Sequence, residues 1–365
     1  MALTLDNGTI NARQLNVLVF LYTIGTTVLV IPAGLVSAAK HDAWLGGLAG
    51  VAIGVVVLVL YIALWRRYPG LTFVGICRAV LGRWFGTLLS IVFTLYSLIG
   101  ASTVLFYVGN FYNINFLPRT PFMCITALFA AIVVMGVRLG LETIARTTEL
   151  MLPWFLILLV VLLATLAPSI EGNRMLPVFE ADWRQILWAG FTFSETAFMP
   201  VLFLFPVFPR VADGVRAWKG MYVTALAGGL CVVLVTLMCI LILGPDITSR
   251  NMFPSYALVK KISIGNFFQR IEAVLAGMWF ITTYIKTTFY FYGWVTSLSE
   301  ILKLKNYRTI TLPCGFILVA LSVVVYPDVV YMQEWDTIVY PPYIWSFCVA
   351  VPVLLWLAGL WRKRS

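Results

Sequence analysis

The stretch FTFSETAFMPVLFLFPVFPR, Phe191 to Arg210, decides the fold of this chain. It is apolar enough to enter a membrane, yet it contains one carboxylate, Glu195, and three prolines follow at Pro200, Pro206 and Pro209. A proline inside a helix removes one backbone hydrogen bond and clashes with the preceding turn. The stretch therefore predicts a membrane helix that is interrupted close to an acid.

The composition of the whole chain indicates a membrane protein. Of its 365 residues, 61% are hydrophobic and only 11% are charged, and the mean hydropathy is +0.96. Soluble domains carry roughly 25% charged residues, so we expect an all-α, polytopic membrane protein. The first apolar run is too long for the core of a signal peptide and is expected to stay as an anchor.

About ten hydrophobic segments are predicted to cross the bilayer as one transmembrane domain over residues 1–365. They lie near 13–38, 44–66, 84–112, 120–138, 141–167, 184–208, 214–244, 268–300, 308–326 and 340–361. Residues 72–83 predict a short amphipathic helix on the membrane surface.

The distribution of Lys and Arg predicts the orientation. With the N-terminus inside, 16 of them fall on the cytoplasmic side and eight outside, and Lys286 lies within a span. Positive residues favour the inside, so both termini are expected in the cytoplasm. The net charge of +10 is spread through the loops, which argues against a nucleic-acid-binding face.

Two segments of the chain resemble each other. YTIGTTVLVIP (Tyr22–Pro32) and FTFSETAFMP (Phe191–Pro200) share an aromatic residue, two threonines around a small residue, and a final proline. They open spans one and six, and a unit of five spans must be inverted in its second copy. We therefore predict a 5+5 inverted repeat (about 13–167 and 184–361) with broken helices one and six.

Breaks at mid-membrane would turn the backbone into a binding surface. Gly25 lets the chain leave the helical conformation. The amides at the start of a half-helix suit a carboxylate, and freed carbonyls suit an ammonium or a cation. The alternative is a proline kink whose carbonyls are satisfied by neighbouring Ser and Thr.

Two ionisable side chains are predicted inside the membrane, Glu195 in span six and Lys286 in span eight. Each alone would cost roughly 3 kcal/mol or more at the bilayer centre, so both are functional candidates. Glu195 can carry a proton, and the ammonium of Lys286 can take the place of a sodium ion. The alternative is a structural ion pair between them.

Two helical faces are candidates to complete a ligand site. They consist of Thr283, Lys286, Thr287 and Tyr290 in span eight and Tyr96, Gly100 and Thr103 in span three. For Tyr96 and Tyr290 the alternative is ordinary aromatic packing with a bonded hydroxyl.

Two further polar stretches lie at the ends of spans. Glu142 and Glu149 bracket Arg146 at helical spacing, which predicts an inner gate or a solvated ion-pair cluster. The stretch 326–343 holds aromatics and three acids and is predicted to be an outer loop in an interfacial belt.

No motif of an enzyme, a metal site or a cofactor site is present in the sequence. There is no GxSxG, HExxH or P-loop. His41 is the only histidine, and the six cysteines form no CxxC pair. We therefore expect no catalytic activity, no bound metal and no cofactor.

Four motifs together resemble the B subunits of bacterial spore germinant receptors. In order, they are GTTVLVIP (Gly25–Pro32), GRWFG (Gly82–Gly86), RLGLETIARTTELMLP (Arg138–Pro153) and FSETAFMP (Phe193–Pro200). That family is similar to the amino acid–polyamine–organocation transporters, which have a five-plus-five inverted-repeat fold.

The resemblance implies a sensor in the spore inner membrane that binds a small germinant, often an amino acid. Its implied partners are an ion-conducting A subunit and a C lipoprotein. The implied ligand site consists of Gly25, Thr26, Thr27, Tyr96, Gly100, Ser194, Glu195, Phe198, Thr287 and Tyr290. A second hypothesis is an autonomous amino-acid transporter of the same fold, coupled to protons through Glu195 or using Lys286 in place of sodium.

Overall fold

The computed structural model describes residues 8–261 and 272–362. This part of the chain is helical and contains no strand apart from one β-bridge between Ile10 and Val211. The long helices are α1 (Ala12–Ile24), α2 (Thr27–Ala39), α3 (Ala43–Arg67), α5 (Arg83–Asn115), α6 (Phe122–Leu139), α7 (Leu141–Leu166), α8 (Trp183–Ala197), α9 (Gly214–Leu243), α12 (Glu272–Ile301), α13 (Arg308–Val324) and α16 (Ala350–Arg362). Shorter elements are η1 (Lys40–Asp42), α4 (Phe73–Leu81), η2 (Ala167–Ser169), η3 (Gly172–Met175), η4 (Met199–Leu204), η5 (Phe208–Arg210), α10 (Pro245–Arg250), α11 (Pro254–Lys260), α14 (Val329–Glu334), η6 (Trp335–Val339) and α15 (Tyr340–Cys348).

Within the described residues, each predicted span is helical. Seven segments are long and apolar enough to cross a membrane: Thr27–Arg67, Arg83–Asn115, Phe122–Leu139, Leu141–Ser169, Trp183–Leu204, Gly214–Leu243 and Val329–Leu360. The remaining predicted segments are α12, α13 and, in the first half of span one, α1. The predicted surface helix is α4. The start of span eight (268–271) and the charges Arg270, Lys363 and Arg364 lie outside the described residues.

The first span is broken, as predicted, at Gly25. Gly25 has φ +38°, a conformation that favours glycine, and α2 begins two residues later. Its carbonyl accepts a hydrogen bond from Thr282 Oγ1 at 2.8 Å. Pro32 lies inside α2 rather than at the break, and the Val28 carbonyl four residues before it accepts a hydrogen bond from Ser255 Oγ at 2.6 Å.

The sixth span is also broken, where α8 ends at Ala197 and the chain continues as the 3₁₀ segment η4. Pro200 has no amide hydrogen to bond the Thr196 carbonyl four residues earlier. Lys286 Nζ donates to that carbonyl at 2.7 Å. Two carbonyls further along the chain also accept hydrogen bonds, at 3.0 Å each. The Met199 carbonyl accepts from the Tyr61 hydroxyl, and the Pro200 carbonyl accepts from the Tyr22 hydroxyl. The sequence left two alternatives open, a broken helix with a free backbone and a kink whose carbonyls are satisfied by side chains. The structure combines them: the helices are broken, and these carbonyls are satisfied by side chains.

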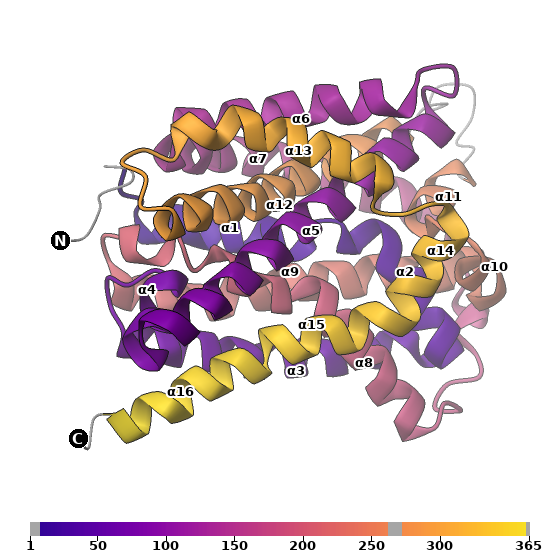
Figure 1. Ribbon diagram of the computed structural model, residues 1–365. Coiled ribbons are helices and arrows are strands. Elements are labelled where there is room, and N and C mark those ends of the chain that lie inside the picture. Colours follow the sequence, from indigo (N-terminus) through magenta and orange to yellow (C-terminus); the bar gives the residue numbers. More distant parts are fainter. Residues whose placement is uncertain (1–7, 262–271, 363–365) are drawn as a thin grey trace.

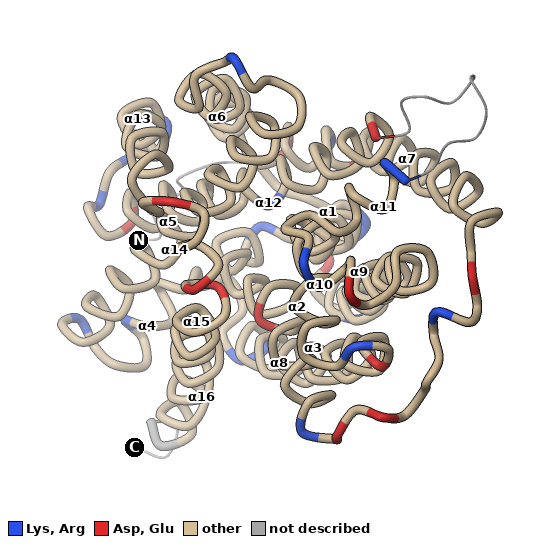
Figure 2. The backbone as a smooth tube through the Cα atoms, turned by 90° about the vertical axis from the view of Figure 1, so that its right-hand side faces the viewer, with Lys and Arg blue, Asp and Glu red and all other residues tan. Residues whose placement is uncertain are grey.

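The broken helices pack against α3, α7, α9 and α12 (Figure 1). Figure 2 views the helices nearly end-on. Close packing of α8 on α3 depends on glycines four residues apart: a side chain at Gly50 or Gly54 would overlap Phe193 or Phe198. The start of α1 and the end of α16 lie at the same end of the molecule (Figure 1), as expected for an even number of crossings.

The prediction of an outer loop over 326–343 is wrong. The chain becomes helical at Val329 and stays so through α14, the π-helical turn η6 and α15. Pro341 and Pro342 do not interrupt the helix; they lie at the start of α15, directly after the π-helical turn. The tenth apolar segment therefore starts 11 residues earlier than predicted, at Val329 instead of 340.

Candidate functional site

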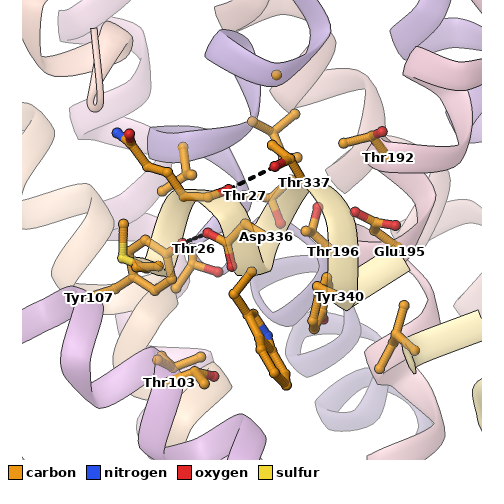
Figure 3. Close-up of a pocket in the computed structure, with 18 of the residues that line it drawn as sticks. Thr26, Thr27, Thr103, Tyr107, Thr192, Glu195, Thr196, Asp336, Thr337 and Tyr340 are labelled. Carbon is orange, nitrogen blue, oxygen red and sulfur yellow. Dashed lines mark hydrogen bonds between the residues drawn. The ribbon is translucent and has the colours of Figure 1, made fainter. Parts of the chain in front are cut away.

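A cavity of about 370 Å³ lies beside both helix breaks. Its wall comes from α2, α5, α8, α12 and the stretch from α14 to α15, with α10 at one end. Figure 3 shows Glu195 and Thr196 on one side of this space and Tyr107 on the other, with Thr26 and Asp336 between them. Helices far apart in sequence thus meet around one small volume, as in a ligand site.

Most of the predicted ligand and ion residues line this cavity. They are Thr26, Thr27, Tyr96, Gly100, Glu195, Lys286 and Tyr290. The close approach of α5 to α12 depends on Gly100, because a side chain there would overlap the Tyr290 ring. Thr103, on the predicted stripe of span three, also lines the cavity.

Gly25, Ser194, Phe198 and Thr287 are not among the lining residues. Ser194 and Thr287 donate their hydroxyls within their own helices, to the carbonyls of Phe191 and Thr283. The Phe198 ring lies against Gly54 of α3 and Gly229 of α9, because the turn into η4 directs it away from the cavity. Gly25 lies directly against the Lys286 side chain.

Lys286 links the two breaks. Its side chain passes Gly25 at the first break, and its ammonium donates to the Thr196 carbonyl at the second. The side chain is buried, with 3% exposure. The alternative of an ion pair with Glu195 does not occur, since none of the ion pairs among the described residues involves either side chain.

Three buried polar atoms of the cavity wall have no hydrogen-bond partner among the described residues. They are the Tyr343 hydroxyl and, in residues that are each 1% exposed, Glu195 Oε2 and Thr27 Oγ1. A buried polar group without a hydrogen bond costs about 1–3 kcal/mol. Such groups in a cavity wall are therefore suited to a ligand that satisfies them.

The tyrosines of the site combine packing with exposure to the cavity. Tyr96 stacks on Tyr343 at 4.0 Å between ring centroids and donates its hydroxyl to the Tyr343 carbonyl at 3.2 Å. Tyr290 packs on Phe203 at 5.0 Å. The packing interpretation therefore holds for both rings, although both also line the cavity.

The contribution of the tenth span to the cavity was not predicted. Asp336, Trp335 and Tyr340 line the cavity, but they fall in the stretch that was assigned to a loop. Met332, Asp336 and Tyr340 are spaced four residues apart, and this spacing indicates one helical face. It was the signal that could have placed them.

At the end of the molecule that holds the start of α1, the start of the chain contacts the segment after the sixth span and α7. Ile10 N donates to the Arg210 carbonyl at 3.0 Å, and Ala212 N donates to the Ile10 carbonyl at 2.9 Å. Glu149 contacts Arg13 at 3.6 Å, whereas Arg146 pairs with Glu142 alone. Of the predicted cluster, the pair Arg146–Glu142 forms, whereas Glu149 faces α1.

The chain matches the family described as "Spore germination protein" over residues 9–328. It is 26% identical to spore germination protein KB of Bacillus subtilis (strain 168), over 99% of this chain and 97% of that protein. It is 21% identical to spore germination protein B2 of the same organism, over 93% of this chain and 92% of that protein.

Two solved transporter structures share the fold. Mhp1, a nucleobase-cation-symport-1 family transporter in a closed conformation with bromovinylhydantoin bound, aligns with a TM-score of 0.71 at 11% identity, covering 95% of this chain and 77% of Mhp1. MhsT in complex with L-phenylalanine aligns with a TM-score of 0.66 at 12% identity, covering 97% of this chain and 99% of MhsT. The predicted fold class is thereby confirmed, and by its sequence the chain belongs to the spore germination protein family.

Proposed function

We propose that this protein is a subunit of a spore germinant receptor that binds a small, amino-acid-like germinant in the cavity between its two helix breaks. The observation that carries the proposal is the pair of unpartnered, buried polar groups, Glu195 Oε2 and Thr27 Oγ1, in the cavity wall. The curated relatives named above are spore germination proteins, and MhsT was solved with L-phenylalanine.

The start of α2 fits the carboxylate of such a ligand. Thr26 and Thr27 both line the cavity at the first turn of this helix. Backbone amides in the first turn of a helix favour an anion. The unpartnered Thr27 hydroxyl adds a donor at the same place.

Glu195 also fits a role in coupling. It precedes Thr196, whose carbonyl the Lys286 ammonium binds, so any movement of the second break displaces its carboxylate. A ligand that binds one arrangement of the breaks more tightly shifts the protein toward that arrangement. We propose that this shift is passed to an A subunit and a C lipoprotein in the spore inner membrane, with both termini of this chain cytoplasmic.

Reconstitution tests the proposal against the transporter alternative. Purified protein in liposomes, without partners, is expected to be stabilised against thermal unfolding by at least one common L-amino acid and to show no saturable uptake of it. Saturable uptake would favour autonomous transport. The absence of stabilisation by any small solute would contradict ligand binding in the cavity.

Replacing Glu195 with glutamine should flatten the pH dependence of the ligand-induced stabilisation. Glutamine keeps the size and one acceptor oxygen of the side chain, but it does not gain or lose a proton between pH 5 and 9. The measurement is the shift in Tm caused by the stabilising amino acid between pH 5 and 9. Glu180→Gln, at an exposed position, is the control. An unchanged pH profile in Glu195→Gln would remove Glu195 from the coupling role.

A further inference from the structure

Asp336 is a carboxylate of the cavity wall that the proposed function does not use. Its two oxygens accept hydrogen bonds from the hydroxyls of Tyr107 and, at 3.5 Å, Tyr326. The residue lies in the π-helical turn η6, Trp335–Val339. π-Helical turns are rare in proteins, but those that occur are often found at functional sites. The extra residue in such a turn redirects the side chains around it. Figure 3 shows Asp336 in the cavity close to Thr26 and Tyr107.

No cationic side chain neutralises Asp336 in the part of the chain that the structure describes. The ion pairs found there are Arg13–Glu149, Arg146–Glu142 and Arg174–Glu171. Arg250 lines the same cavity but does not reach Asp336. A carboxylate removed from bulk water is stabilised best by an opposite charge, so its surroundings favour a positively charged ligand group.

The side chains around Asp336 suit an ammonium group in particular. Tyr107, Trp335 and Tyr340 line the cavity with it. An ammonium is attracted to the faces of aromatic rings as well as to a carboxylate. A carboxylate beside aromatic rings is therefore a suitable environment for an amine.

Five backbone carbonyls near the breaks already accept hydrogen bonds from protein side chains: those of Gly25, Val28, Thr196, Met199 and Pro200. Glu195 Oε2 has no partner in the described part of the chain, but Glu195 belongs to the second break, whereas Asp336 lies close to Thr26 at the start of α2 (Figure 3). The start of α2 favours an anion. A zwitterion with its carboxylate there would direct its ammonium toward the tenth span.

We propose that Asp336 recognises a positively charged amino group of the ligand, and that the ligand is therefore an amino acid or another amine rather than a neutral sugar or a simple carboxylic acid. This assignment rests on the proposed function, because it assumes that the cavity binds a small solute. It identifies a specificity-determining residue on the tenth span.

Pairs of ligands that differ only in the amino group test the assignment. The first probes are the common L-amino acids and D-glucose. Each amino acid that binds is then compared with the 2-hydroxy acid that carries the same side chain. Binding is measured by thermal unfolding of the purified full-length protein. The unmodified protein should prefer the amino acid over its hydroxy acid by about 10- to 100-fold, the range of a hydrogen bond to a charged group.

In Asp336→Asn, affinity for the amino acid should fall by about 10- to 100-fold, while affinity for the hydroxy acid stays within about twofold. Asparagine keeps an oxygen that can accept from Tyr107, so the Tm without ligand should change little. Glu334→Gln, two residues away and exposed, is the control and should keep the preference. If Asp336→Asn does not fold, Asp336→Glu keeps the charge and should keep the preference at reduced affinity.

Several outcomes would overturn the assignment. Asp336→Asn could retain the preference, Asp336→Glu could lose it, or Asp336→Asn could weaken both ligands of a pair equally, which would indicate a purely structural role. Binding of D-glucose but of no amine would overturn the assignment and the amino-acid-like nature of the germinant, and would leave standing only that the cavity binds a small germinant. Binding of no probe would overturn both.

Discussion

Valine in place of Gly25 is expected to abolish ligand binding. The backbone at this position has φ +38°, and a β carbon there would overlap the Lys286 side chain and approach the Tyr22 carbonyl. The strained backbone alone should cost about 1–3 kcal/mol of the free energy of unfolding. The larger effect is on the site, because a displaced Lys286 releases the Thr196 carbonyl and moves both breaks.

The measurement is the ligand-induced shift in Tm, with the amount of membrane-inserted protein as the test of folding. Gly25→Ala should show a smaller loss than Gly25→Val, since valine is branched at the β carbon. Gly277→Ala on α12 is the control, because a side chain there meets only Leu158 at 3.6 Å. Normal affinity in Gly25→Val would contradict the role of the first break in binding.

The second large effect is expected from Lys286→Met. Methionine has a similar length and no charge, so the Thr196 carbonyl loses its donor at 2.7 Å. An unsatisfied buried carbonyl should lower the free energy of unfolding by about 1–3 kcal/mol. Ligand binding should weaken strongly, because the two breaks are no longer held together by one side chain.

Thermal unfolding and ligand titration in sodium chloride and in potassium chloride provide the measurement. If the ammonium takes the place of a sodium ion, ligand binding to the unmodified protein is the same in both salts. Lys305→Met, at an exposed position, should behave like the unmodified protein. An unchanged Tm together with unchanged binding in Lys286→Met would show that the link between the breaks contributes nothing.

The positions of the breaks could be predicted from the sequence because single residues determine them. Glycine tolerates the backbone at position 25, and Pro200 lacks the amide that would continue α8. The contact between Lys286 and Thr196 could not be predicted, because it depends on how α12 packs against α8. The same holds for Phe198, which the 3₁₀ segment turns toward Gly54 and Gly229.

The tenth span shows where local sequence signals mislead. Acids, aromatics and two adjacent prolines are typical of a membrane-surface loop. In the structure the prolines begin α15, and the acid Asp336 is bonded to two tyrosines. Within residues 326–343, the four-residue spacing of Met332, Asp336 and Tyr340 indicated a helix, but the local composition favoured a loop.

The bridge between Ile10 and Val211 has a mechanical consequence. Its two backbone hydrogen bonds join the start of the chain to the segment that follows η5, so a pull on the first residues acts on the sixth span without passing through the lipid-facing helices. Two such bonds contribute about 1–3 kcal/mol in total. That is the usual size of the coupling free energy between two sites, so the bridge is of the strength that the binding of one ligand can offset.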